Sequence, residues 1–231
     1  MTDVVELRQY TLHPGQRDVL IELFDREFVE TQEETGMRIL GQFRDLDKPN
    51  RFVWMRSFPD MPTRAEALNA FYTGPAWKAH SRAANATMVD VDNVLLLRPA
   101  GQAGGFNLDA AVRDTPASSL VVASIYALPE PADDELVRFF DSTVVPLLAK
   151  TGATPLGLLQ TEYAENNFPA LPVRTGEHVI VLLASFAGRD AYAEHTSRLA
   201  ELPEWVEDVQ PRLPASVERL LLTPTDRSML R

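Results

Sequence analysis

The sequence contains no cysteine, and this absence excludes several kinds of chemistry. Without thiols the chain can form no disulfide, no thiolate metal site and no cysteine nucleophile. It also has no apolar run long enough to span a bilayer, and Met1-Thr2-Asp3 precedes neither a basic segment nor an apolar signal core. These features predict a cytoplasmic protein that crosses no membrane.

Basic residues are scarce relative to acidic ones. The chain has 22 Lys and Arg against 33 Asp and Glu, which leaves a formal charge of −11. A surface of this sign repels phosphate groups, so neither nucleic acid nor an anionic membrane is an expected partner. The sequence also has no dinucleotide fingerprint or phosphate loop. His13, His178 and His195 lack the spacing of metal ligands, so we expect no multi-histidine metal site.

What the sequence does contain is an internal repeat. In each copy a strand-like segment leads through proline into a helical pattern that stops at a glycine. These positions lie 116 residues apart: segments 8–12 and 124–128, and Gly36 and Gly152. Strands that end at Phe58 and Phe186 match at an offset of 128, so the second copy carries extra residues in a loop. Two copies of about 100 residues each have the size of ordinary domains.

Both copies show the same order of elements: strand, helix, strand, strand, helix, strand. In the first copy the expected strands are 4–12, 37–44, 51–58 and 94–98. The first expected helix is 17–35. A second is capped by Thr63 and Glu66, and a short third follows Gly74-Pro75. In the second copy the expected strands are 120–128, 156–163, 179–186 and 217–222, and the helices are 134–150, bent at Pro146, 191–199 and 205–213. This order is the ferredoxin-like motif.

The repeat divides the chain into a first domain at 1–100, a linker at 101–117 and a second domain at 118–231. The extra residues of the second domain form a hairpin insertion at 163–178. The predicted fold class is α+β: two tandem ferredoxin-like domains packed sheet to sheet as a pseudo-dimer that resembles a dimeric α/β barrel. The helices cover only one face of each sheet, so the other faces could pack together and enclose a cavity.

Strand alternation separates two sets of side chains in the first copy. We assign the aliphatic set to the face under the helices: Val5, Leu7, Val53 and Met55. The opposite set is aromatic and charged, and we expect it to face the second sheet across the cavity: Glu6, Arg8, Tyr10, Phe52, Trp54, Arg56 and Phe58.

The polar set is confined to the first copy. At the matching offsets the second copy has apolar or small residues: Val122 for Glu6, Ser124 for Arg8, Leu158 for Gln42, Leu182 for Trp54 and Ala184 for Arg56. Buried charges are costly unless they are paired, and two interpretations remain open. The charges form an ion cluster that fixes how the sheets dock, or they bind a carboxylate, phenolate or enolate of a ligand. The second interpretation places any ligand site on the first-copy side.

Two further regions have a structural and a functional interpretation. Trp77, His80 and Ala84 share one stripe of a helix. His80 either packs at the helix edge with a backbone hydrogen bond, or it reaches the cavity rim as a proton shuttle or haem ligand. Asn166 and Asn167 lie in the insertion, which either covers the mouth of the cavity or docks on a partner subunit.

Three segments of the sequence resemble the NIPSNAP family: Val5-Glu6-Leu7-Arg8-Gln9-Tyr10-Thr11-Leu12, Phe52-Val53-Trp54-Met55-Arg56-Ser57-Phe58 and Pro75-Ala76-Trp77-Lys78-Ala79-His80. The resemblance covers the first copy almost completely and the second more loosely. It implies the dimeric α/β barrel superfamily, whose members include cofactor-independent monooxygenases, muconolactone isomerases and haem-degrading enzymes. The segment that ends at His80 resembles the helix that supplies the axial histidine in the haem-degrading relatives.

Three functional hypotheses follow. In the first, the protein is a cofactor-independent monooxygenase, isomerase or cyclase of a planar anionic metabolite. Arg8 and Arg56 then hold negative charge, and His80 or Glu6 moves a proton. The other expected contacts of the substrate are Tyr10, Gln42, Trp54, Trp77, Asn166 and Asn167. In the second hypothesis His80 is the axial ligand of haem. In the third the protein is a non-catalytic binding or scaffold protein. A homodimer is a further expectation, because symmetric dimers are common.

Overall fold

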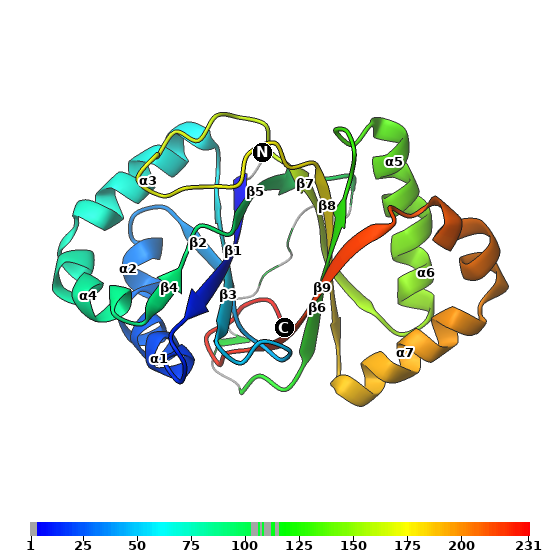
Figure 1. Cartoon of the computed structure of the whole chain (residues 1–231), viewed down its shortest axis with the longest axis horizontal. Coiled ribbons are helices and arrows are strands. Elements are labelled where there is room, and N and C mark those ends of the chain that lie inside the picture. Colours follow the sequence, from blue (N-terminus) through cyan, green and yellow to red (C-terminus); the bar gives the residue numbers. More distant parts are fainter. Residues whose placement is uncertain (1–3, 103–105, 107, 109–111, 114–115) are drawn as a thin grey trace.

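The computed structural model describes residues 4–102, 106, 108, 112–113 and 116–231. Figure 1 shows a central barrel of strands with helices packed on two opposite sides. The first half of the chain supplies the helices on one side, and the second half supplies those on the other. Among the described residues, no helix is both long and apolar enough to cross a membrane.

The elements of the first half are, in chain order, β1 (Val4–Leu12), α1 (Arg17–Glu27), α2 (Val29–Glu33), β2 (Arg38–Asp45), β3 (Arg51–Phe58), α3 (Met61–Thr73), α4 (Pro75–Asn85), β4 (Met88–Asp90) and β5 (Val94–Pro99). The expected helix 17–35 is thus two helices, because the chain bends at Phe28. The short β4 was not expected from the sequence.

The elements of the second half are β6 (Leu120–Ala127), α5 (Asp134–Phe139), a π-helical segment (Phe140–Val144), α6 (Val145–Lys150), β7 (Thr154–Thr161), β8 (Val179–Phe186), α7 (Arg189–Glu201), a second π-helical segment (Glu204–Val209), a 3-10 turn (Gln210–Arg212) and β9 (Ser216–Pro224). The first π-helical segment lies directly before Pro146, where the sequence predicts a bend.

The strands close into one antiparallel barrel. In the described part of the chain, neighbouring strands follow the order β3-β2-β9-β6-β8-β7-β5-β1, and pairing of β1 with β3 closes this ring of eight. The two halves share strand pairs at β2–β9 and at β5–β7. The short β4 adds to β1 outside the ring. The predicted α/β barrel within one chain is therefore confirmed.

Helix ends follow the local sequence signals with one exception. Gly36 and Gly152 stop the helices that precede them, with φ of 95° and 113°, a left-handed backbone that favours glycine. The cap expected from Thr63 and Glu66 is wrong, because α3 begins three residues earlier. Asp60 is its cap, and the Asp60 carboxylate accepts a hydrogen bond from the Thr63 N–H at 2.8 Å.

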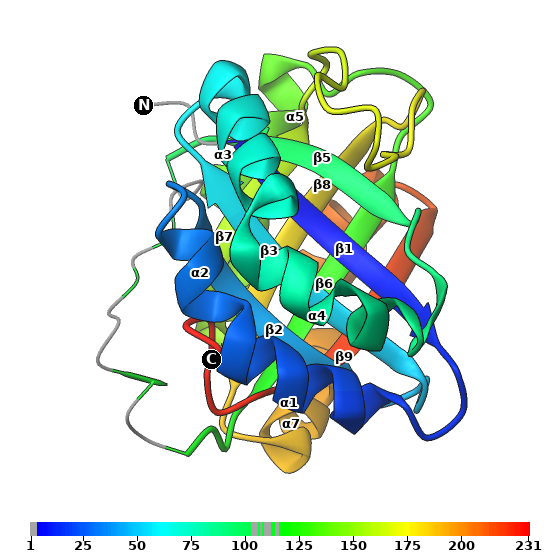
Figure 2. The same ribbon diagram turned by 90° about the vertical axis from the view of Figure 1, so that its left-hand side faces the viewer.

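The side-chain faces of the first-half strands are the reverse of the expected ones. Val5, Leu7, Val53 and Met55 belong to one mostly aliphatic core with second-half residues such as Val121 and Leu183, and this core, which also includes Phe43, fills the barrel. Tyr10, Phe52, Trp54 and Phe58 instead pack with residues of the helices. Figure 2 shows these helices lying over the first-half strands.

The width of the barrel explains this reversal. An eight-stranded barrel has room only for the side chains of its own strands, and compact aliphatic side chains fill that room. The larger aromatic and arginine side chains occupy the layer under the helices, where helix residues give them polar partners. A packed core therefore takes the place of the expected cavity between the sheets.

The linker expected at 101–117 is described only in part. Phe106 and Leu108 pack against the barrel core. Arg113 forms two hydrogen bonds with the Glu33 carboxylate, at 3.0 and 2.8 Å. The rest of this predicted linker, 103–105, 107, 109–111 and 114–115, lies outside the described residues.

Candidate ligand site under the first-half helices

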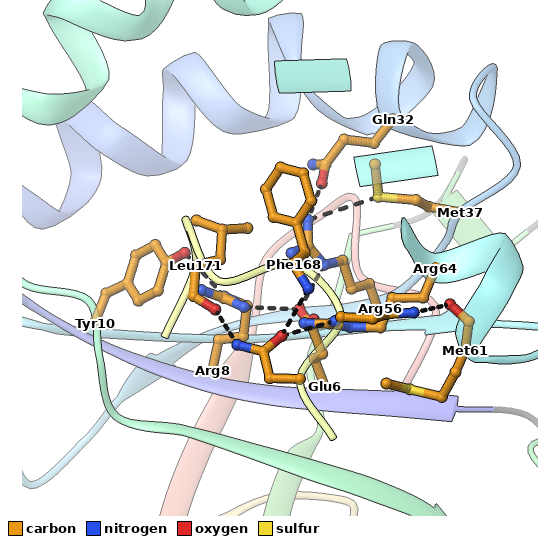
Figure 3. Close-up of polar contacts among 12 residues, drawn as sticks. Glu6, Arg8, Tyr10, Gln32, Met37, Arg56, Met61, Arg64, Phe168 and Leu171 are labelled. Carbon is orange, nitrogen blue, oxygen red and sulfur yellow. Dashed lines mark hydrogen bonds and ion pairs between the residues drawn. The ribbon is translucent and has the colours of Figure 1, made fainter. Parts of the chain in front are cut away.

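Glu6 lies at the centre of a buried ion cluster (Figure 3). The Glu6 Oε2 accepts hydrogen bonds from Arg8 Nη1 and Arg56 Nε, each at 2.7 Å. The Glu6 Oε1 accepts one from Arg64 Nε at 2.7 Å. All four side chains are fully buried. We call these four residues the arginine cluster.

Strand register and one helix bring the arginine cluster together. β1 and β3 run antiparallel in a register that places Glu6 opposite Arg56 and Arg8 opposite Trp54. Directly opposed residues project from the same face of a sheet, here the face toward the helices. Arg64 comes from the buried stripe of α3 and reaches the carboxylate from above the sheet.

The arginine cluster carries more positive than negative charge. Three guanidinium groups surround one carboxylate, which leaves two positive charges in excess. Burial alone would raise the pKa of Glu6, but Arg56, Arg8 and Arg64 hold it well below its usual range. Burial lowers the pKa of Arg64, and repulsion from Arg56 and Arg8 lowers it further. The attraction of Glu6 raises it but does not cancel these effects. A guanidinium keeps its proton in proteins, so Arg64 stays charged. Its lowered pKa shows that burial of a third cation costs free energy.

The excess charge has only neutral acceptors among the described residues. The Arg8 Nε donates to Tyr10 Oη at 2.9 Å, and the Arg56 Nη1 donates to Gln32 Oε1 at 3.0 Å. The Nη2 atoms of Arg8 and Arg56 are buried and have no hydrogen-bond partner in the described part of the chain. A buried donor without an acceptor costs about 1–3 kcal/mol, and more if it is charged.

Trp54 lies against both of these guanidinium groups. Its ring centroid is 5.5 Å from the Arg8 Cζ and 5.0 Å from the Arg56 Cζ. Such cation–π contacts stabilise each cation by about 0.5–2 kcal/mol, but a ring face does not replace an oxygen acceptor for the Nη2 groups. An anion placed beside them would supply both an acceptor and the missing negative charge.

The insertion of the second half covers the arginine cluster. The Arg64 Nη1 donates to Asn166 Oδ1 at 3.1 Å and to Asn167 Oδ1 at 2.8 Å. Phe168 and Leu171 pack against the first-half core, and Figure 3 shows them beside the cluster. The insertion therefore covers the arginine cluster within this chain. The site that it covers lies under the helices and not between the sheets.

An aromatic cavity of about 90 Å³ adjoins the arginine cluster. Tyr10, Gln32 and Trp54 form the wall between them, because each lines the cavity and also contacts Arg8 or Arg56. The rest of the lining is Leu20, Phe24, Phe28, Phe71, Tyr72, Trp77, Asn85, Met88, Val91 and Leu171. Since a cavity of about 150 Å³ holds benzene, this one admits an aromatic ring only after a side chain has moved.

Most of the residues singled out from the sequence meet at this site. The cluster, its wall and its cover contain eight of them: Glu6, Arg8, Tyr10, Trp54, Arg56, Trp77, Asn166 and Asn167. Gln42 and His80 lie elsewhere. Gln42 is fully buried, and its backbone N–H donates to Ser228 Oγ at 3.2 Å, but it lines neither the cluster nor the cavity.

His80 is a partly exposed residue of α4 that faces α1. Its side chain is 33% exposed, and its Nε2 lies 3.3 Å from the Glu27 Oε2. It does not line the aromatic cavity. The cavity is also far smaller than the roughly 300–1,000 Å³ of ordinary ligand pockets. His80 and this cavity therefore do not fit a haem group. The part of the chain that the structure describes holds no group of three or more His, Asp or Glu residues suited to a metal ion.

Sequence reasoning missed two polar residues of the arginine cluster and its wall, Arg64 and Gln32. Arg64 shares the buried stripe of α3 with Ala67, Leu68 and Phe71. A charged residue at helical spacing among apolar ones was the available signal. Gln32 gave no such signal, because α2 is too short for a clear apolar stripe.

The comparisons with known proteins bear on fold and family. Residues 5–101 match the model of the NIPSNAP family. A provisionally assigned monooxygenase from Lactobacillus acidophilus NCFM is 13% identical with a TM-score of 0.57, and the match covers 97% of this chain and 94% of that chain. Another, from Fusobacterium nucleatum, is 11% identical with a TM-score of 0.60, covering 97% and 93%. A NIPSNAP-like domain protein from Burkholderia xenovorans is 26% identical over 41% of this chain and 84% of its own, with a TM-score of 0.37. A search among curated proteins finds no match.

At these identities the two whole-chain similarities show the fold alone, a mixed α/β fold with an eight-stranded antiparallel barrel. The family match concerns the half that carries the arginine cluster and its aromatic cavity: residues 5–101 form a domain that matches the NIPSNAP family model.

Proposed function

We propose that the first half binds a small planar metabolite with an anionic group and acts on it as an enzyme of the dimeric α/β barrel superfamily. The observation that carries this proposal is the buried excess of two positive charges, with unpartnered Nη2 groups on Arg8 and Arg56. Purely structural clusters gain nothing from surplus buried cations. A ligand that brings negative charge offsets their cost.

The reaction that suits this arrangement passes through an enolate or phenolate. Donors fixed beside developing negative charge stabilise such a species strongly where water is excluded. Tyr10 also fits this role: its oxygen already accepts from Arg8, so its hydroxyl proton is free to be donated, and burial raises its pKa. Glu6 is a poor base, because three guanidinium groups hold its carboxylate ionised. These roles reassign the expected ones, since neither Glu6 nor His80 is placed to move a proton.

Ligand entry requires the insertion to move. The cavity is too small for an aromatic ring, and Leu171 is part of its lining. Phe168 stacks on Tyr72, which lines the cavity, with ring planes 29° apart. The Phe168 ring therefore covers this side of the cavity. Displacement of this segment would enlarge the cavity and open it toward the arginine cluster. We further infer that the two halves are duplicated ferredoxin-like units, and a homodimer remains a prediction.

The test is binding and turnover of phenylpyruvate, whose enol form is planar and anionic. Calorimetry should show that Arg56→Met weakens binding at least about tenfold, and that Arg44→Met, which alters a half-buried arginine paired with Asp18, does not. Exchange of the C3 protons for deuterium, followed by NMR, reports enolisation. Faster exchange with the wild type than with Arg56→Met supports an enzyme. Equal binding by the wild type and Arg56→Met contradicts the proposed site, and binding without exchange favours the non-catalytic alternative.

A further inference from the structure

The second half contains a cavity where the first half has its arginine cluster. This cavity has a volume of about 200 Å³ and lies between the outer face of the strands and α7. Its wall includes Ser124 and Ala184, which correspond to Arg8 and Arg56 at the offsets of 116 and 128. Small residues at these two positions leave space that guanidinium groups fill in the first half.

The helices over the two sites also correspond. α3 and α7 each have 13 residues, and their first residues, Met61 and Arg189, are 128 positions apart. This offset matches three pairs of residues: Arg64 with Tyr192, Ala67 with His195, and Trp77 with Trp205. The second half thus has an imidazole where the first half has a methyl group.

The contacts of His195 fix the position of its proton. His195 is buried, and its Nδ1 lies 2.9 Å from the Thr151 Oγ1. The Thr151 hydroxyl gives its one proton to the carbonyl oxygen of Leu147 or Leu148, at 3.1 and 3.0 Å. Its oxygen is therefore an acceptor, so the His195 Nδ1 is protonated and the Nε2 carries a lone pair.

The Nε2 of His195 is the acceptor left for a ligand. It has no hydrogen-bond partner within the described residues, and His195 lines the cavity. Burial lowers the pKa of His195, which keeps the imidazole neutral near pH 7. No corresponding acceptor exists in the first half, where Ala67 takes this place.

Arg219 and Tyr126 are two further polar residues of the lining, which also includes Ser124, Tyr192 and Thr196. Arg219 is exposed, lies opposite Ser124 in the β6–β9 register and forms no ion pair with any described residue. Burial raises the pKa of Tyr126, so its phenol is a donor. Most of the remaining wall is apolar, with Trp205 among it. The cavity thus has one neutral acceptor, one cation at its exposed edge, and apolar surface between them.

We propose that this cavity binds a small hydroxylated aromatic carboxylate, with the hydroxyl at His195 and the carboxylate at Arg219. A volume above the roughly 150 Å³ that holds benzene fits one ring with its substituents. The lone pair of the His195 Nε2 can accept a hydrogen bond, and a phenolic or enolic hydroxyl of the ligand supplies the donor. An arginine at the edge that interacts with Tyr126 but has no ion-pair partner among the described residues suits a carboxylate. This site differs from the one in the first half in location and in chemistry, since that site is dominated by guanidinium donors.

Titration of the intact protein with the three hydroxybenzoate isomers, and with benzoate as the matched probe without a hydroxyl, tests this proposal. Trp205 lines this cavity, whereas Trp54 and Trp77 line the other, so the site can be identified from fluorescence. We expect at least one isomer to bind more tightly than benzoate and to change the emission. In Trp205→Phe that change should disappear while calorimetric binding persists.

Two variants and two controls assign the groups. His195→Phe should weaken hydroxybenzoate binding about tenfold and leave benzoate binding unchanged, which also shows that the cavity is still folded. Arg219→Met should weaken both probes by about threefold to tenfold, and Arg198→Met, another exposed arginine on the second half, should weaken neither. Arg56→Met should leave the change in Trp205 emission intact, which separates this site from the first-half site. The proposal is overturned if no isomer binds at millimolar concentration, or if His195→Phe affects both probes equally.

Discussion

The two halves of the chain place different polar groups on the same scaffold. Between the first-half strands and helices lie one carboxylate and three guanidinium groups, fully buried, beside a cavity of about 90 Å³. The corresponding space of the second half has a cavity of about 200 Å³ with His195 on its wall. The first site offers excess positive charge and donors, and the second offers a neutral acceptor.

This difference shows where the fold tolerates change. The barrel core is aliphatic in both halves, with Val5 and Leu7 of β1 matched by Val121 and Ala123 of β6. The layer under the helices differs at most of the corresponding polar positions. The two halves therefore have similar barrel interiors but different layers under their helices. The predictions below test this contrast, in order of decreasing expected effect.

The largest effect is expected for Glu6→Gln. Removal of the only carboxylate leaves three buried guanidinium groups without a negative partner. Breaking a buried ion pair in this way costs about 3–5 kcal/mol. Denaturant titration should show this loss in the free energy of unfolding. The counterpart Val122→Ala should cost clearly less, and similar losses from the two variants would mean that the cluster does not stabilise the first half.

Arg8→Met should separate binding from stability. Glu6 keeps Arg56 and Arg64 as partners after this change, and one surplus cation is removed. We therefore expect the free energy of unfolding to stay within about 1 kcal/mol of the wild type, while binding of phenylpyruvate falls at least about tenfold. Ser124→Ala, at the corresponding position, should leave that binding unchanged. A loss of several kcal/mol in Arg8→Met would favour the purely structural interpretation of the cluster.

Asn167→Ala should loosen the cover of the first-half site. Asn167 accepts from Arg64 at 2.8 Å and donates to the Met61 carbonyl oxygen at 2.6 Å. Loss of these two hydrogen bonds should destabilise the docked insertion by about 1–2 kcal/mol and speed amide hydrogen exchange within 163–178. Ligand association should also become faster. Unchanged exchange in that segment would show that other contacts hold the cover closed.

The smallest effect concerns pH. Burial raises the pKa of Asp25 to about 6, although Thr225, Arg227 and Arg44 act in the opposite direction. The folded state then keeps a proton that the unfolded chain has released, so stability falls as pH rises from about 4 to 6. Asp25→Asn should remove this part of the pH dependence and add about 1–2 kcal/mol at pH 7.

The matched control for Asp25 is Asp141, 116 positions later. Its carboxylate accepts a hydrogen bond from the Gln102 N–H at 3.0 Å. Asp141→Asn should therefore give no such stabilisation. A pH profile of thermal unfolding for both variants checks this prediction. A gain in stability from Asp141→Asn but not from Asp25→Asn would contradict it.

The sequence predicted the barrel and the main strands and helices, because these depend on local periodicity and on glycine and proline signals. It did not predict which strand face meets the helices. Alternation assigns Glu6 and Leu7 to opposite faces but does not say which face is inside, and we placed the charged face in the barrel. The deciding factor is the limited width of the barrel, which no single strand encodes.

The candidate site was predicted in composition but not in place. Glu6, Arg8 and Arg56 were singled out because charges in a buried strand need a reason, and they do lie together. Arg64 was missed, since its contact with Glu6 spans 58 positions. His195 was set aside because it lacks histidine neighbours in the sequence, and its relation to Thr151 depends on tertiary packing.

The most direct test of the central claim, that the excess charge of the first half marks an anion site, is a crystal structure of the protein with phenylpyruvate. The account predicts ligand density under the first-half helices. The carboxylate or enolate oxygen should lie within hydrogen-bond distance of the Nη2 of Arg8 or Arg56, and Phe168 should be displaced. A saturated crystal in which the arginine cluster stays covered and its Nη2 groups contact no ligand atom would contradict the account.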